Sequence, residues 1–182
     1  MTDTKTYGKL IGASLGPGDP DLITRRAWTA LQSGARWIYP VKKAQEISYA
    51  LSIVQNGGLP VPTDAVELVF PMTRDAEALG KAWPRAARRT VELLAEGRDV
   101  VFLVEGDAST FATFGHLARV VREIVPGIEV DTIPGVSSFT AAAAATGLPL
   151  AEEDETLAII PTAYGIGVIE HMLDEFDTLI LL

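Results

Sequence analysis

Three short loops of glycine and small polar residues carry the side chains best suited to binding a ligand. The loops are Gly16-Pro17-Gly18-Asp19-Pro20, Glu105 to Thr110 and Ile133 to Ser138, and each lies at the end of an expected strand. Glycine lets a backbone approach a ligand closely, and carboxylates and hydroxyls supply hydrogen-bonding groups. Each loop alone fits a tight turn or a helix cap. Because parallel strands bring such loops to one edge of a sheet, the three together favour a ligand cleft.

Several other chemistries are excluded or unsupported. The chain has no cysteine, so it has no disulfide, thiolate metal site or thiol nucleophile. Its two histidines, His116 and His171, lack metal-ligand spacing, and no metal site is expected. Ser137 and Ser138 do not lie in a G-x-S-x-G elbow. The glycines of the first loop also depart from the G-x-G-x-x-G dinucleotide spacing.

The net charge of −9 is unevenly distributed along the 182 residues. Residues 1–100 contain 13 basic and 11 acidic side chains, whereas residues 101–182 contain 2 and 13. This balance argues against nucleic acid and anionic membranes as partners. No apolar run is long enough to cross a bilayer, and the polar start lacks a secretory signal. We therefore expect a cytoplasmic location and no membrane partner.

Short β-branched runs alternate with helical patterns through the first 150 residues. This alternation with short connections predicts an α/β fold, with a parallel sheet covered by helices on both faces. The expected strands are 9–15, 36–39, 66–70, 99–104 and 129–133. The expected helices are one that starts at Pro20 after the Asp19 cap and ends before Gly34, then 46–55, much of 75–96 with a kink or fresh start at Pro84, 110–124 and 138–145.

The sequence pattern changes after residue 150. Glu152 to Glu155 is a run of four acids, typical of an exposed linker, and an expected strand at 156–160, a helix at 167–173 and an apolar run at 178–182 follow. We predict an N-terminal α/β domain over residues 1–150 and the beginning of a second α/β domain over residues 151–182. An apolar strand normally continues into a covering element, so we expect the C-terminal part of that domain to lie outside this chain.

The three loops, in this order, resemble the tetrapyrrole (corrin/porphyrin) methylases, a family of S-adenosylmethionine-dependent methyltransferases. The matching segments are Gly16 to Thr24, Glu105 to Thr113 and Ile133 to Phe139. Within the family, three further segments resemble the branch that methylates C20 of precorrin-2: Tyr39 to Lys42, Phe70 to Met72 and Pro149 to Ile160. The resemblance extends over essentially the whole chain.

The resemblance implies a two-domain α/β homodimer that holds S-adenosyl-L-methionine in a cleft between its domains and releases S-adenosyl-L-homocysteine. By match to the family motifs, the cofactor-binding residues are Pro17 at the cleft, Gly106, Asp107 and Thr110 in contact with the cofactor, Ser137 and Ser138 on its other side, and, as a weaker match, Pro161 and Thr162. Ala108 stands where the family commonly has proline.

The function implied is methylation of C20 of a small-molecule tetrapyrrole, precorrin-2 or the cobalt-containing factor II. Two alternatives stay open: methylation at another position of uroporphyrinogen III or another precorrin, and a non-catalytic nucleotide-binding module. Glu105, Asp107 and His116 are all candidates for accepting the proton lost from C20, and their spacing singles out none. The catalytic base is therefore unassigned.

A substrate with many carboxylates needs local positive charge on this acidic protein. Nearly all the cations precede residue 100, so we expect the neutralising side chains among Arg25, Arg26, Lys42, Lys43, Arg74 and the Arg85 to Arg89 helical face.

Overall fold

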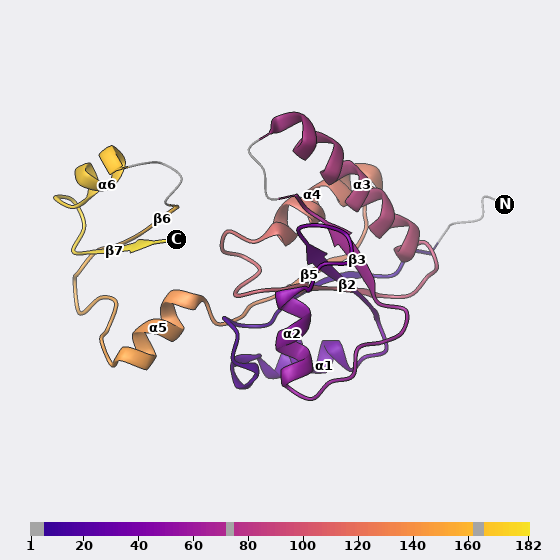
Figure 1. Cartoon of the computed structure of the whole chain (residues 1–182), viewed down its shortest axis with the longest axis horizontal. Helices are drawn as coiled ribbons and strands as arrows, with labels where there is room; N and C mark the ends of the chain where they lie inside the picture. Colours follow the sequence, from indigo (N-terminus) through magenta and orange to yellow (C-terminus); the bar gives the residue numbers. More distant parts are fainter. Residues whose placement is uncertain (1–5, 72–74, 162–165) are drawn as a thin grey trace. The chain divides into compact units, whose positions relative to one another are not determined.

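A computed structural model describes residues 6–71, 75–161 and 166–182. The chain divides into two compact units, Met1–Ser137 and Ser138–Leu182. The first unit contains a five-stranded parallel sheet and the second a two-stranded parallel sheet (Figure 1). This confirms the predicted α/β class.

The sheet of the first unit has the order β3-β2-β4-β1-β5. All its strand pairs are parallel, so every strand ends at the same edge, which we call the carboxyl edge. The strands are β1 (Leu10–Ser14), β2 (Arg36–Val41), β3 (Val66–Val69), β4 (Val100–Val104) and β5 (Val130–Ile133). The order places β4, β1 and β5 side by side.

The two faces of this sheet carry separate hydrophobic cores. In β4, Val100, Phe102 and Val104 point into one core, and Val101 and Leu103 point into the other. All five are buried, as expected for a central strand covered on both faces. Its continuous apolar sequence therefore forms a strand with helices on either side.

Helices α1 (Arg25–Leu31) and α2 (Tyr49–Asn56) cover one face, and α3 (Ala76–Leu94) and α4 (Thr113–Ile124) cover the other (Figure 1). Side-chain N-caps determine where several of these helices begin. Thr24 accepts a hydrogen bond from Ala27 N at 3.3 Å, and Ser48 accepts one from Leu51 N at 3.4 Å. Helix α3 continues through Pro84 as a single helix, so the predicted alternative of a fresh start there is wrong.

The first predicted helix is two elements in the structure. Asp19 caps a 3-10 turn, η1 (Pro20–Leu22), by accepting a hydrogen bond from Asp21 N at 2.9 Å. The α-helix begins only after Thr24, because that side chain caps a second start. Two caps in succession were not predicted, so the single helix expected between the Asp19 cap and Gly34 was too long.

The second unit contains α5 (Ser138–Thr146), β6 (Leu157–Ile160), α6 (Ile166–Met172) and β7 (Thr178–Leu181). Asp177 fixes the start of β7 beside β6, because its carboxylate accepts hydrogen bonds from the amide and the hydroxyl of Thr156, both at 2.8 Å. The compact unit begins at Ser138, whereas the sequence boundary lies after residue 150. The domain boundary at 150 stays a prediction.

Candidate functional site: three loops at the carboxyl edge

The loops after β1, β4 and β5 meet because their strands are neighbours in the sheet. The first two loops are joined directly by backbone hydrogen bonds between Gly16 and Gly106. Gly106 N donates to Gly16 O at 2.8 Å, and Gly16 N donates to Gly106 O at 3.2 Å. Both glycines have positive φ, 74° and 72°. A side chain at either position would strain this turn, which explains the residue type.

Asp107 ties the second loop to the third. One carboxylate oxygen accepts hydrogen bonds from Ser109 N at 2.9 Å, from the Ser109 hydroxyl, and from Thr110 Oγ1 at 3.3 Å. The other oxygen accepts a hydrogen bond from Gly135 N at 2.7 Å. Burial raises the pKa of Asp107, but the hydrogen bonds from Ser109, Gly135 and Thr110 outweigh it and hold the pKa below its usual value. Asp107 is therefore an ionised bridge between loops.

Ser14, the last residue of β1, makes a second bridge. Its side chain is fully buried, and its hydroxyl donates to Ile133 O at 2.6 Å while accepting a hydrogen bond from Ala108 N at 2.8 Å. A proline at position 108 has no N–H and could not make the second of these bonds. The hydrogen bonds of Ser14 and Asp107 together form what we call the loop clamp.

Gly135, in the third loop, lies close to the end of β1 and to the second loop. A Cβ atom at this position would lie 2.4 Å from Ser14 Cβ and 2.9 Å from Gly106 O. Such distances are far below ordinary van der Waals contact, so only glycine fits without a shift of the loops.

Two exposed aromatic side chains border the loops. Tyr49 of α2 donates a hydrogen bond from its hydroxyl to Pro17 O at 3.4 Å, and this hydroxyl occupies the space that a Cβ at Gly18 would need. Phe111 follows the second loop, is 63% exposed and has a φ of 51°. A non-glycine residue in this left-handed region costs about 1–2 kcal/mol. The chain thus holds an aromatic ring in solvent against a conformational cost.

The structure brings together most of the cofactor-binding residues expected in the first unit. Pro17, Gly106, Asp107 and Thr110 lie in loops that are hydrogen-bonded to one another or to a neighbouring side chain. Ser137 ends the third loop. The remaining three belong to the second unit or lie beyond the described residues: Ser138 begins α5, Pro161 follows β6, and Thr162 lies outside the described residues. Their roles stay predictions.

The three candidate bases differ in their surroundings. Asp107 has both oxygens engaged, so it is poorly placed to accept a proton. The His116 ring contacts Trp83 of α3 at a centroid distance of 4.0 Å, and burial together with the charge of Arg119 lowers the pKa of His116. Glu105 is exposed at the start of the second loop. No base is assigned.

Sequence reasoning did not identify Ser14, Gly135, Tyr49 or Phe111 as site residues. Ser14 had a detectable signal, because it is the only hydroxyl side chain in the otherwise apolar run LIGAS. Gly135 and Tyr49 depended on contacts between segments far apart in the sequence, and Phe111 depended on its exposure and backbone conformation. Among the described residues, no cluster of three or more potential metal ligands occurs, and no helix is long and apolar enough to span a membrane.

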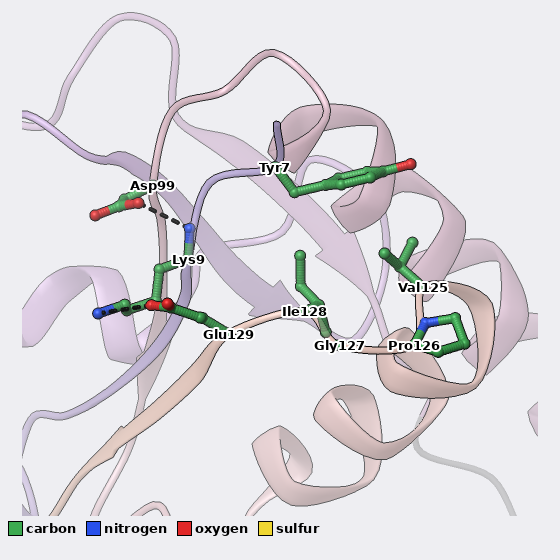
Figure 2. Close-up of a pocket in the computed structure, with 8 residues that line it drawn as sticks. All are labelled: Tyr7, Lys9, Asp99, Val125, Pro126, Gly127, Ile128 and Glu129. Carbon is green, nitrogen blue, oxygen red and sulfur yellow. Dashed lines mark hydrogen bonds and ion pairs between the residues drawn. The ribbon is translucent and has the colours of Figure 1, made fainter. Parts of the chain in front are cut away.

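A separate hollow lies at the opposite edge of the sheet, where β1, β4 and β5 begin (Figure 2). Its polar groups already have partners. Lys9 N donates to Asp99 Oδ1 at 2.8 Å, and Lys9 Nζ lies 3.0 Å from a carboxylate oxygen of Glu129. Figure 2 shows Tyr7 and Val125 on the other side of this hollow. It therefore has no part in the predicted loop site.

The cations expected near a carboxylate-rich substrate are dispersed. Arg26 is paired with Asp131 at 2.7 Å. Arg74 lies outside the described residues. Three exposed arginines of α3 line a groove beside β3, one of the two edge strands of the sheet: Arg85, Arg88 and Arg89. Neutralisation of substrate by any of these side chains stays a prediction.

Comparison with known proteins decides the family. The family model described as "Tetrapyrrole (Corrin/Porphyrin) Methylases" matches residues 9–182. The chain belongs to the tetrapyrrole methylases. The resemblance found in the three loops is thereby confirmed, and the chain is a member of a methyltransferase family.

Two curated relatives of this tetrapyrrole methylase match nearly all of its chain. It is 34% identical over 178 residues to a protein of Methanocaldococcus jannaschii named "Probable cobalt-precorrin-2 C(20)-methyltransferase". The aligned residues cover 98% of this chain and 73% of that relative. It is 35% identical over 175 residues to the "Cobalt-precorrin-2 C(20)-methyltransferase" of Salmonella typhimurium. Here the aligned residues cover 96% of this chain and 72% of the relative.

Solved structures agree with this methylase fold. The methyltransferase CobJ gives a TM-score of 0.62 at 25% identity, with 91% of this chain and 62% of the CobJ chain covered. A putative cobalamin synthesis related protein from Corynebacterium diphtheriae gives a TM-score of 0.71 at 18% identity, with 97% and 72% covered. This tetrapyrrole methylase chain thus spans less than two thirds of the CobJ chain.

Proposed function

We propose that this chain belongs to an S-adenosyl-L-methionine-dependent methyltransferase that acts on C20 of precorrin-2 or cobalt-factor II in cobalamin biosynthesis. The observation that carries the proposal is the identity of 34% and 35% to two relatives named for the C20 position, over almost the entire chain. A third relative, from Sinorhizobium sp, is named "Precorrin-2 C(20)-methyltransferase" and is 32% identical over 164 residues. The proposal includes a cytosolic homodimer.

The carboxyl edge fits the proposed cofactor. A Cβ at Gly106 would meet no atom within 4 Å, so this backbone borders open space that a ligand can approach. Pro17, Gly106, Thr110 and Ser137 would hold the cofactor from the first unit. Ser138, Pro161 and Thr162 would contribute from the second.

The cofactor, when bound, supplies a methyl group on a positively charged sulfur. The residues of this chain bind and orient the reacting groups. Holding reacting groups in line lowers the activation barrier of well-oriented intramolecular reactions by about 7–11 kcal/mol. Rigid loops at the carboxyl edge can therefore supply much of the rate enhancement. The reaction forms a carbon–carbon bond at C20, breaks the bond between sulfur and methyl, and releases one proton from C20 to a base or to water.

Incubation of the protein with isotope-labelled S-adenosyl-L-methionine and each candidate tetrapyrrole tests the substrate. We expect label on C20 of precorrin-2 or cobalt-factor II. Label at another ring position would favour a methylase of another position. A "Precorrin-4 C(11)-methyltransferase" of Pseudomonas aeruginosa is 33% identical over 154 residues, which cover 85% of this chain and 53% of that relative. A folded protein that binds no S-adenosyl-L-homocysteine would refute both methylase assignments and favour the non-catalytic module.

We also propose that Phe111 contacts the tetrapyrrole. Its exposed ring and its left-handed backbone support a binding role, because strain of this kind persists where function requires it. Phe111→Gly should raise KM for the tetrapyrrole at least tenfold, while the free energy of unfolding stays the same or rises by up to about 1 kcal/mol as strain is relieved. Steady-state kinetics and chemical denaturation measure the two effects.

A matched control is Ile124→Ala, because Ile124 is also exposed, at 42%, but ends α4 far from the second loop. It should leave KM unchanged. An unchanged KM in Phe111→Gly would remove the ring from the substrate site.

A further inference from the structure

Ser14 is the one hydroxyl side chain that the structure shows connecting all three loop-bearing strands. It ends β1, its hydroxyl hydrogen is donated to the last carbonyl of β5, and its oxygen accepts the amide of Ala108 in the loop after β4. The distances are 2.6 Å and 2.8 Å. Both bonds are buried, where an unpaired partner is costly.

The conformation of the second loop depends on the hydrogen bond from Ala108 N to Ser14 Oγ. Ala108 is 4% exposed, so its amide hydrogen has no access to bulk water if Ser14 Oγ is removed. Alanine also leaves φ free at a position where proline would fix it. Hydrogen bonding by Ser14 therefore restrains a loop that its own sequence leaves loose.

Asp107, the other member of the loop clamp, also binds atoms of the loops themselves. Asp107 directs both carboxylate oxygens to groups of this chain, namely Ser109, Thr110 and Gly135. The buried hydroxyl and the buried carboxylate thus fix the second loop from its two sides, and the backbone of Gly106 remains facing open space.

We infer that Ser14 is a positioning residue for cofactor binding, which acts without touching the cofactor by holding the backbone of Gly106 to Ala108 in its binding conformation. Asp107 acts in the same way, as a bridge between loops. The inference rests on the proposed function, since it assumes that S-adenosyl-L-methionine binds at the carboxyl edge.

The test measures binding of S-adenosyl-L-homocysteine by calorimetry to the full chain and to three variants. Ser14→Ala removes only the hydroxyl, and we expect Kd to rise at least tenfold. Thr90→Val is the matched control, because Thr90 is also fully buried and donates one hydrogen bond, to Ala86 O at 2.9 Å within α3. Its Kd should equal that of the unaltered protein.

The third variant tests the route through Ala108. In Ser14→Ala combined with Ala108→Pro, no amide hydrogen is left unpaired, and φ at position 108 is fixed. We expect its Kd to fall back toward that of the unaltered protein. Rescue by a second substitution is a result that a general loss of packing would not give.

The outcomes are separable. If the unaltered protein binds and Ser14→Ala binds within twofold of it, or if Thr90→Val weakens binding equally, the inference is overturned. Failure of the double variant to bind more tightly than Ser14→Ala also overturns it. If the unaltered protein does not bind, the proposed function itself fails. Should Ser14→Ala not fold, Ser14→Cys replaces it, and its weakly hydrogen-bonding thiol should give a smaller rise in Kd.

Discussion

Replacing Gly135 with alanine should weaken binding of S-adenosyl-L-homocysteine at least tenfold. The new Cβ would lie 2.4 Å from Ser14 Cβ and 2.9 Å from Gly106 O, so β1 and two loops would have to separate. The same movement would stretch the hydrogen bond from Gly135 N to Asp107, now 2.7 Å long. Overpacking of this kind costs about 1–3 kcal/mol, and here the cost falls on the proposed cofactor site.

Calorimetry measures the binding, and chemical denaturation measures the accompanying loss of stability. Gly115→Ala is the matched control. Gly115 lies in α4, and a Cβ there meets no atom within 4 Å. Alanine at this helical position should stabilise the protein by about 0.5–1 kcal/mol and leave binding intact. Normal binding by Gly135→Ala would contradict the close approach of the third loop to β1 and to the second loop.

Asp107→Ala should also remove cofactor binding and should lower the free energy of unfolding by about 3 kcal/mol. The change leaves the amides of Gly135 and Ser109 and the hydroxyls of Ser109 and Thr110 without their carboxylate acceptor. Hydrogen bonds to a charged group contribute about 1.5–3 kcal/mol each, and the flexible loop recovers part of the loss through water. Binding with unchanged affinity would remove Asp107 from the site.

The pH dependence of the unfolding free energy shows how much of the contribution of Asp107 comes from its negative charge, because asparagine has a similar shape and no charge. Because the pKa of Asp107 is lowered on folding, its ionised form stabilises the folded state fully above the ordinary aspartate pKa of about 4. This contribution is lost as the pH falls through the lowered pKa of the folded state. The difference in unfolding free energy between the unaltered protein and Asp107→Asn should be constant from about pH 7 to about pH 5 and should shrink below about pH 4.

Denaturation series at several pH values measure this difference. A difference that stays constant down to about pH 2 would mean that Asp107 titrates alike in the folded and unfolded states. The hydrogen bonds to its carboxylate would then only balance the cost of burying the charge.

Much of the first unit was predictable from local pattern. The apolar runs that became β1 and β4 were correctly placed to within one residue, because buried parallel strands need continuous apolar sequence. The edge strand β5, with the mixed sequence VDTI, was also placed to within one residue. Helix starts were less accurate where two capping residues compete. Asp19 and Thr24 both cap, and only packing against the sheet determines that the α-helix follows the second.

The candidate site was predictable in its loops and not in its internal contacts. The positions of Gly106, Asp107 and Thr110 in one motif indicated that these residues act together. Their motif also suggested that Asp107 touches the cofactor, whereas the structure directs both its oxygens to other loop atoms. The motif records which residue is required and does not record whether it acts on the ligand or on its neighbours.

By itself, the sequence determined the α/β class, the three loops, the absence of thiol chemistry and, through motif order, the methylase family. Each of these depends on residue type and on spacing along the chain. The tertiary structure alone decided that β1 lies between β4 and β5 and that Ser14, Asp107 and Gly135 consequently meet. Ser14 and Ala108 are 94 positions apart in sequence, and a hydrogen bond over such a separation is set by strand order, which local sequence does not encode.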